Sequence, residues 1–90
     1  MKIPKKIKIC GITYDVNIVE HIDDGNTCAR LVRDCNLILI ASGLSKEQQE
    51  LSFLHECVHA VNGEMSENTV DFIAVILHGI ITDNYERRTK

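Results

Sequence analysis

The sequence has 90 residues, enough for one domain with a small hydrophobic core. Its hydrophobic content of 44% and charged content of 26% are those of an ordinary globular protein, and its net charge of −3 gives no support for nucleic-acid binding. The longest apolar run, residues 72–81, is too short to cross a bilayer, and the basic N-terminus is not followed by the apolar segment of a secretory signal. We therefore expect a single domain over residues 1–90, located in the cytoplasm, that binds neither nucleic acid nor a membrane.

The first half of the chain carries the patterns of β-strands. Apolar and polar residues alternate over residues 3–9 and again over residues 12–18, which predicts a β-hairpin. After a polar turn at residues 23–26, two further strands are expected at residues 28–32 and 37–41. The last of these segments is almost continuously apolar, as expected of a strand that is covered on both faces.

The second half predicts two helices. The capping box Ser45–Gln48 starts a helix over about residues 46–61. Gly63 can end this helix in the left-handed conformation, and Ser66 can cap a second helix over about residues 67–82. The second helix is apolar over much of its surface, which places it in the core or at a contact between subunits.

These elements define the expected architecture. The predicted fold class is α+β, with a small N-terminal antiparallel sheet of three to four strands packed on two C-terminal helices. Residues 83–90 are expected to form a flexible tail. So small a domain has little surface for a deep cleft, so we also expect a homo-oligomer or a protein partner to contribute to any specificity.

His55-Glu56-Cys57-Val58-His59 is an H-E-x-x-H motif within the first predicted helix. Residues four apart lie one above the other on a helix face, so His55 and His59 can offer two imidazoles to one metal ion. Glu56 lies about 100° round the helix from His55, where it can act on a metal-bound water without binding the metal. Two nitrogen ligands and a nearby carboxylate are what zinc-assisted hydrolysis requires.

A catalytic zinc needs a third protein ligand, and two carboxylates follow the motif. Glu67 comes eight residues after His59, and Asp71 four residues after Glu67. If the chain turns back after the first helix, Glu67 approaches the two histidines, and Asp71 can accept the free ring N–H of a ligand histidine. Because both carboxylates lie on one face, the reverse assignment also stays open, with Asp71 as the third ligand and Glu67 as a cap residue.

The remaining candidate side chains receive structural interpretations. His78 lies eleven residues after Glu67, too far along a straight helix to share one ion with it. Cys57 faces away from the expected metal and is interpreted as a small buried thiol. The four cysteines include no C-x-x-C pair, so all are expected to be reduced thiols.

The motif and the carboxylates that follow it resemble a known class of metalloprotein. His55, Glu56 and His59, followed by Glu67-x-x-x-Asp71, resemble the gluzincin arrangement, in which a Glu on the next helix completes a site of two histidines and one glutamate. More narrowly, the chain is similar to the small phage- and prophage-encoded metallopeptidases related to the ImmA/IrrE-type peptidases. The segments that carry this similarity are residues 53–60 and 67–74 and, less specifically, 1–8 and 46–50.

The resemblance implies roles for named residues. His55, His59 and Glu67 would be the zinc ligands, and Glu56 would be the catalytic carboxylate of a minimal zincin-like domain. It also implies that an extended peptide pairs with a strand preceding the motif helix, for which residues 37–41 are the expected segment.

The expected function is therefore a zinc-dependent metallopeptidase with a peptide or protein substrate, hydrolysing peptide bonds through a metal-bound water activated by Glu56. If the chain is encoded by a phage, its location is the cytoplasm of the bacterial host. The alternative is a zinc-stabilised phage or prophage module that binds protein with little or no catalysis; the presence of Glu56 argues against it. A zinc-dependent RNA hydrolase built on three histidines ranks last, because no third histidine follows His59 at short spacing.

Overall fold

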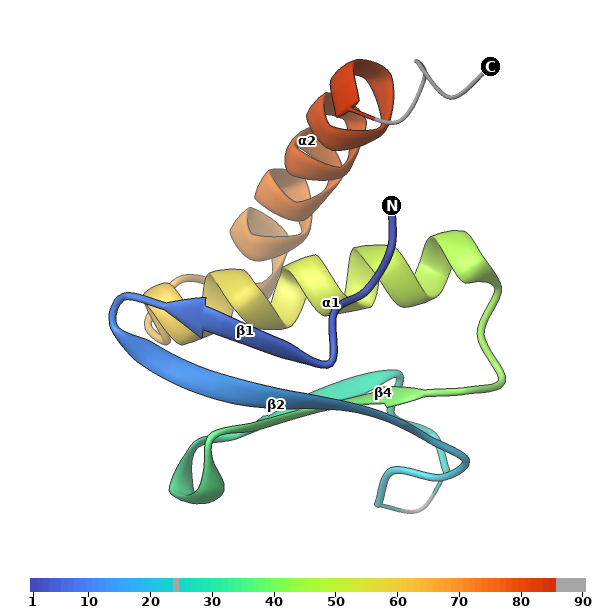
Figure 1. Cartoon of the computed structure of the whole chain (residues 1–90), viewed down its shortest axis with the longest axis vertical. Coiled ribbons are helices and arrows are strands. Elements are labelled where there is room, and N and C mark those ends of the chain that lie inside the picture. The colour runs from blue at the N-terminus through green and yellow to red at the C-terminus, as the bar shows by residue number, and fades with distance from the viewer. Residues whose placement is uncertain (24, 86–90) are drawn as a thin grey trace.

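A computed structural model describes residues 1–23 and 25–85 (Figure 1). The strands are β1 (Lys6–Ile9), β2 (Ile12–Val19), β3 (Ala29–Val32) and β4 (Leu37–Ala41); the helices are α1 (Lys46–Val61) and α2 (Glu67–Tyr85), and a short 3-10 turn, Arg33–Cys35, joins β3 to β4. This order of a four-stranded sheet and two C-terminal helices confirms the predicted α+β class. Neither helix within the described residues has the length and apolar character needed to cross a membrane.

The four strands form one sheet in the order β1-β2-β4-β3. The predicted hairpin of β1 and β2 is present, and the two further predicted strands, β3 and β4, also pair antiparallel. The prediction of a wholly antiparallel sheet is wrong at one position, because β2 and β4 pair in parallel, with Val16 opposite Ile38. The chain crosses from β2 to the outer position of β3 and then returns, so that the most apolar strand, β4, occupies the centre of the sheet.

The central position of β4 bears on the strand expected to pair with a substrate peptide. Both backbone edges of β4 are hydrogen-bonded, to β2 on one side and to β3 on the other. The prediction that a peptide pairs with residues 37–41 is therefore wrong, because this strand has no free edge to offer. The strand at the outer edge on this side of the sheet is β3.

The hydrophobic core lies between the sheet and α1. Figure 1 shows α1 lying across one face of the sheet, and α2 rising from the end of α1 so that its C-terminal half extends beyond the sheet. The core cluster is Tyr14, Val16, Ile38, Ile40, Phe53, Leu54 and Ala74. Phe53 and Leu54 bury one side of α1 in this core, and the motif histidines lie on another side of the helix, where they line a pocket with Ala29 of β3.

The two helix starts follow the predicted caps. The Ser45 side chain accepts a hydrogen bond from the backbone N–H of Gln48 at 3.2 Å, and α1 covers residues 46–61, in agreement with the prediction. Ser66 caps α2 by accepting from the backbone N–H of Thr69 at 3.2 Å. Both caps satisfy N–H groups that have no partner within the helix.

The end of α1 differs from the prediction. Gly63 is not left-handed, and the helix ends through Asn62 in an extended conformation with φ −151°. Gly63 matters for a different reason: a Cβ at this position would come within 2.8 Å of Nη2 of Arg33. That nitrogen donates a hydrogen bond of 2.6 Å to the backbone oxygen of His59, so the absent side chain leaves room for a guanidinium that caps the last turn of α1.

Helix α2 is longer than predicted. Residues 83–85, expected to belong to a flexible tail, continue the helix to Tyr85. Two side chains bond back to the helix backbone, Thr82 to the oxygen of His78 at 2.8 Å and Asn84 to that of Ile80 at 2.9 Å. The remainder of the predicted tail, residues 86–90, lies outside the described residues.

A buried hydrogen bond ties the N-terminal part of α1 to the middle of α2. His78, predicted to be a structural or surface histidine, has a structural role, with Nε2 2.7 Å from Oε1 of the buried Glu50. The amino group of Met1 lies 3.3 Å from the other carboxylate oxygen. Burial by itself raises the pKa of Glu50, but the hydrogen bonds and charges of His78 and the Met1 amine outweigh burial, so the pKa of Glu50 is lowered overall.

Replacing Glu50 with Gln is expected to lower the free energy of unfolding by about 1–3 kcal/mol near neutral pH, because a charged hydrogen bond to His78 is lost in a buried site. A lowered pKa means that the fold favours the ionised carboxylate. This stabilisation is complete above the ordinary value of 4.5 and is lost as the pH falls through the folded value. Urea unfolding of both proteins across this range, in a chelator so that bound metal does not contribute, measures the difference. A difference that stays constant on acidification would contradict the assigned cause.

Candidate metal centre

The motif histidines of α1 bring two ring nitrogens together. Nε2 of His55 lies 3.1 Å from Nε2 of His59, with the ring centroids 4.7 Å apart. The helical spacing of four residues produces this arrangement, since it stacks the two side chains on one face. Both side chains are half-buried, which restricts their rotation while leaving the nitrogens accessible.

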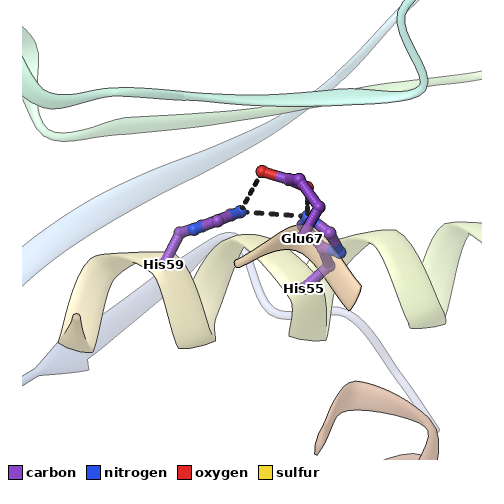
Figure 2. Close-up of side chains that lie close together, drawn as sticks. All are labelled: His55, His59 and Glu67. Atoms are coloured by element: carbon purple, nitrogen blue, oxygen red, sulfur yellow. Dashed lines mark hydrogen bonds and ion pairs between the residues drawn. The ribbon is translucent and has the colours of Figure 1, made fainter. Parts of the chain in front are cut away.

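The first residue of α2 supplies a carboxylate to the same point (Figure 2). Oε1 of Glu67 is 2.8 Å from Nε2 of His55, and Oε2 is 3.0 Å from Nε2 of His59. The turn between the helices and the Ser66 cap bring the first turn of α2 back over α1, as the sequence predicted. His55, His59 and Glu67 each offer one ligand atom, and these atoms lie within 4.8 Å of one another.

Asp71 approaches the opposite ring nitrogen of His55. Its Oδ1 lies 2.6 Å from Nδ1, one helical turn beyond Glu67. This is the position predicted for a carboxylate that orients a ligand histidine. The converging atoms belong to Glu67 rather than Asp71, so the geometry does not follow the alternative in which the two carboxylates exchange roles.

The electrostatics of this cluster favour a cation at its centre. If His55 donates its Nδ1 proton to Asp71, Nε2 of the neutral ring carries a lone pair that points at a carboxylate oxygen of Glu67. Two lone pairs at 2.8 Å repel each other unless a proton or a metal ion lies between them. Tetrahedral zinc with bonds of about 2.0–2.1 Å holds its ligand atoms roughly 3.3 Å apart, so the observed separations need to widen only slightly. The donor set of two imidazoles and one carboxylate is one that zinc accepts in catalytic sites.

Glu56 lies beside this group and is buried. It lines the same pocket as the two histidines and Glu67. Burial raises the pKa of Glu56, opposed in part by the charges of His55 and His59. The carboxylate is therefore held in a buried position beside the candidate ligands without being one of the converging groups.

Cys57 lies inside the motif but takes no part in the group. Burial, followed by the charge of Glu56, raises the pKa of its thiol to about 12. Such a thiol stays protonated at neutral pH and is neither a good nucleophile nor a good metal ligand. This agrees with the prediction of a small buried thiol.

A pocket of about 560 Å³ opens over the candidate centre. Besides the four motif and ligand residues and Asp71, its lining includes Cys28, Ala29, Leu51, Ser52, Ala74 and Val75. Leu51 stands four residues before His55, so helical spacing alone places it on this face. Ala29 is the first residue of β3 and Cys28 directly precedes it; no local pattern indicated them, because their position depends on how the sheet is ordered.

No protein-family model, no curated protein and no solved structure matches the chain. The arguments for a function therefore come from the geometry and chemistry of the described residues.

Proposed function

We propose that the chain is a zinc-dependent metallopeptidase of the gluzincin type, similar to the small phage-encoded relatives of the ImmA/IrrE-type peptidases. The observation that carries the proposal is the convergence of His55, His59 and Glu67 on one point, beside a buried Glu56 in the same pocket. A site that only stabilised the fold would have no use for a buried carboxylate next to the ion, because burial of an unpaired charge costs free energy.

Each residue of the group has a distinct part in the proposed reaction. When bound, zinc supplies Lewis acidity, which lowers the pKa of a coordinated water toward neutrality and polarises a peptide carbonyl. Glu56 accepts the proton of the attacking water and later delivers it to the leaving amine. Asp71 holds His55 in the tautomer that keeps Nε2 free for the ion. Glu67 contributes negative charge and links the two helices.

The proposed substrate is a peptide or protein segment in extended conformation. It would pair with the outer edge of β3, because this strand ends the sheet and its first residue, Ala29, lines the pocket together with the preceding Cys28. This placement replaces β4 as the strand that meets the substrate. The proposed location is the cytoplasm, which is that of a bacterial host if a phage carries the gene.

A second candidate function is a zinc-stabilised module that binds another protein without cleaving it. The observation that favours it is the openness of the site, since the Glu67 side chain is 72% exposed. In a domain this small, an ion that joins α1 to α2 would add substantially to stability. Zinc would then serve the fold, and Glu56 would have no role.

Cleavage of a library of internally quenched peptides by the zinc-loaded protein tests the proposal. We expect fluorescence release that a zinc chelator abolishes and added zinc restores, with the cleaved bonds identified by mass spectrometry. A folded protein that contains one zinc per chain and cleaves nothing in the library would favour the binding module.

Replacing Asp71 with Asn is expected to weaken zinc binding by about 10- to 100-fold, because the partner of His55 Nδ1 loses its charge. Competition with a chromophoric chelator measures the dissociation constant. Asp34→Asn, an exposed change in the turn between β3 and β4, is the matched control and should leave the affinity unchanged. Equal affinities for wild type and Asp71→Asn would contradict the orienting role.

A further inference from the structure

Helix α2 has two apolar faces on opposite sides. One face, which includes the buried Val70 and Ala74, packs mainly on α1. The other face carries what we call the outer stripe: Phe72, Val75, Ile76, Gly79 and Ile80, at the spacings of three and four residues that align side chains along a helix. An ordinary surface helix carries polar residues on its outer side, so this face is unusual for a domain that functions alone.

The outer stripe exposes a large apolar area. Exposed fractions are 67% for Phe72, 58% for Val75, 45% for Ile76 and 48% for Ile80. With areas on the order of 150–200 Å² per side chain, these four residues leave roughly 400 Å² of apolar surface in water. None of the stripe residues is charged, so nothing within the stripe opposes its burial.

The described residues offer no explanation for Gly79 in the middle of this stripe. A Cβ at this position would meet none of their atoms within 4 Å, so none of them requires a glycine here. Glycine weakens a helix interior relative to alanine, and Gly79 is the thirteenth of the 19 residues of α2, well inside the helix. The open space over Gly79 is a gap on the surface of the stripe, flanked by larger side chains.

We propose that the outer stripe is a dimer interface, in which α2 packs antiparallel against α2 of a second copy of this chain about a two-fold axis near Val75 and Ile76. In this register Phe72 of each copy lies over Gly79 of the other, so the largest side chain of the stripe fills its gap. The same register sets Asn68 of each copy opposite Asp83 of the other, which pairs an amide donor with a carboxylate. A parallel pairing would instead bring the two Asp83 carboxylates together. It would also place the like ends of the two helix dipoles side by side, which is unfavourable.

The observations favour a second copy over an unrelated partner. Phe72 and Gly79 lie on the same stripe, and a two-fold axis places each of them opposite the other residue in the second copy. An isologous interface requires this kind of self-complementary surface. Complete pairing of two stripes removes up to about 800 Å² of apolar surface from water, an area typical of a weak, concentration-dependent dimer rather than a permanent one. Val75 also lines the pocket of the candidate metal centre, so the helix of the second copy would border that pocket.

Analytical ultracentrifugation of the full chain over a range of concentrations tests the proposal, with or without metal. We expect a monomer–dimer equilibrium whose dissociation constant rises at least about tenfold in Ile76→Lys, since the two substituted side chains meet at the axis. Val61→Lys is the matched control, because Val61 is also exposed and helical but lies at the end of α1. It should leave the dimer unchanged, and circular dichroism should show that both variants are folded.

Exchanging the large and the small side chain of the stripe tests the register in which the two α2 helices pair. Gly79→Leu should weaken the dimer by obstructing Phe72 of the other copy, and adding Phe72→Ala to the same chain should restore it. A wild-type chain that stays monomeric at every concentration, including one that binds lipid vesicles instead, would overturn the proposal. A dimer that neither Ile76→Lys nor Gly79→Leu weakens would overturn it as well, because its interface would then lie elsewhere.

Discussion

Replacing Glu56 with Gln is expected to lower kcat for peptide cleavage by about 10²- to 10⁴-fold while the protein keeps its zinc. The amide has nearly the same shape as the carboxyl but cannot accept the proton of the attacking water. The ligands His55, His59 and Glu67 are unchanged, so metal content should remain near that of the wild type. Steady-state kinetics on a cleaved peptide, with zinc determined by plasma mass spectrometry on the same samples, measures both quantities.

The same substitution should stabilise the metal-free protein. Because burial raises the pKa of Glu56, the fold favours its protonated form; that preference supports stability below the ordinary value of 4.5 and is lost as the pH rises toward the folded value. At neutral pH the free energy of unfolding of the variant should therefore be higher by on the order of 1 kcal/mol. Such a gain is expected where catalysis requires a buried carboxylate that destabilises the fold. Glu47→Gln, an exposed change in the first turn of α1, is the control for both measurements. Full activity in Glu56→Gln would exclude Glu56 as the catalytic base.

Replacing Glu67 with Ala is expected to reduce zinc from near one ion per chain to a small fraction of that. Glu67 is the one member of the candidate group that α2 contributes, so its loss leaves only the two imidazoles of α1 to hold an ion. Plasma mass spectrometry on protein prepared without a tag or chelator gives the stoichiometry. Thermal unfolding should show that zinc raises the melting temperature of the wild type but not that of the variant, because an ion that binds only the folded state stabilises it.

Glu64→Ala is the matched control for this experiment, since Glu64 is an exposed carboxylate in the turn between the two helices. It should keep both the zinc and the increase in melting temperature. Equal zinc content in wild type and Glu67→Ala would show that the ion, if bound, has another third ligand. A folded wild-type protein that takes up no zinc would contradict the proposed metal centre itself.

Local chemistry determined much of this protein and could be predicted from the sequence. The caps Ser45 and Ser66 set the starts of both helices because a short side chain satisfies backbone N–H groups within three residues of it. The alternating pattern of β1 and β2 predicted their hairpin for the same reason, since partners lie close along the chain. The shared face of His55 and His59 follows from the period of the helix alone.

Contacts between distant segments were decided only by the tertiary structure. The parallel pairing of β2 with β4, and with it the position of β3 at the sheet edge beside the pocket, depends on how the strands pack together against α1, with Ile38 and Ile40 of β4 fully buried. The space at Gly63 depends on Arg33, which is distant in sequence, and the assignment of Glu67 and Asp71 to different nitrogens of His55 depends on the angle at which α2 crosses α1. In each case the sequence specifies side chains that can interact, whereas the packing of whole elements selects which of them meet, because the free energy of burial is summed over the entire core.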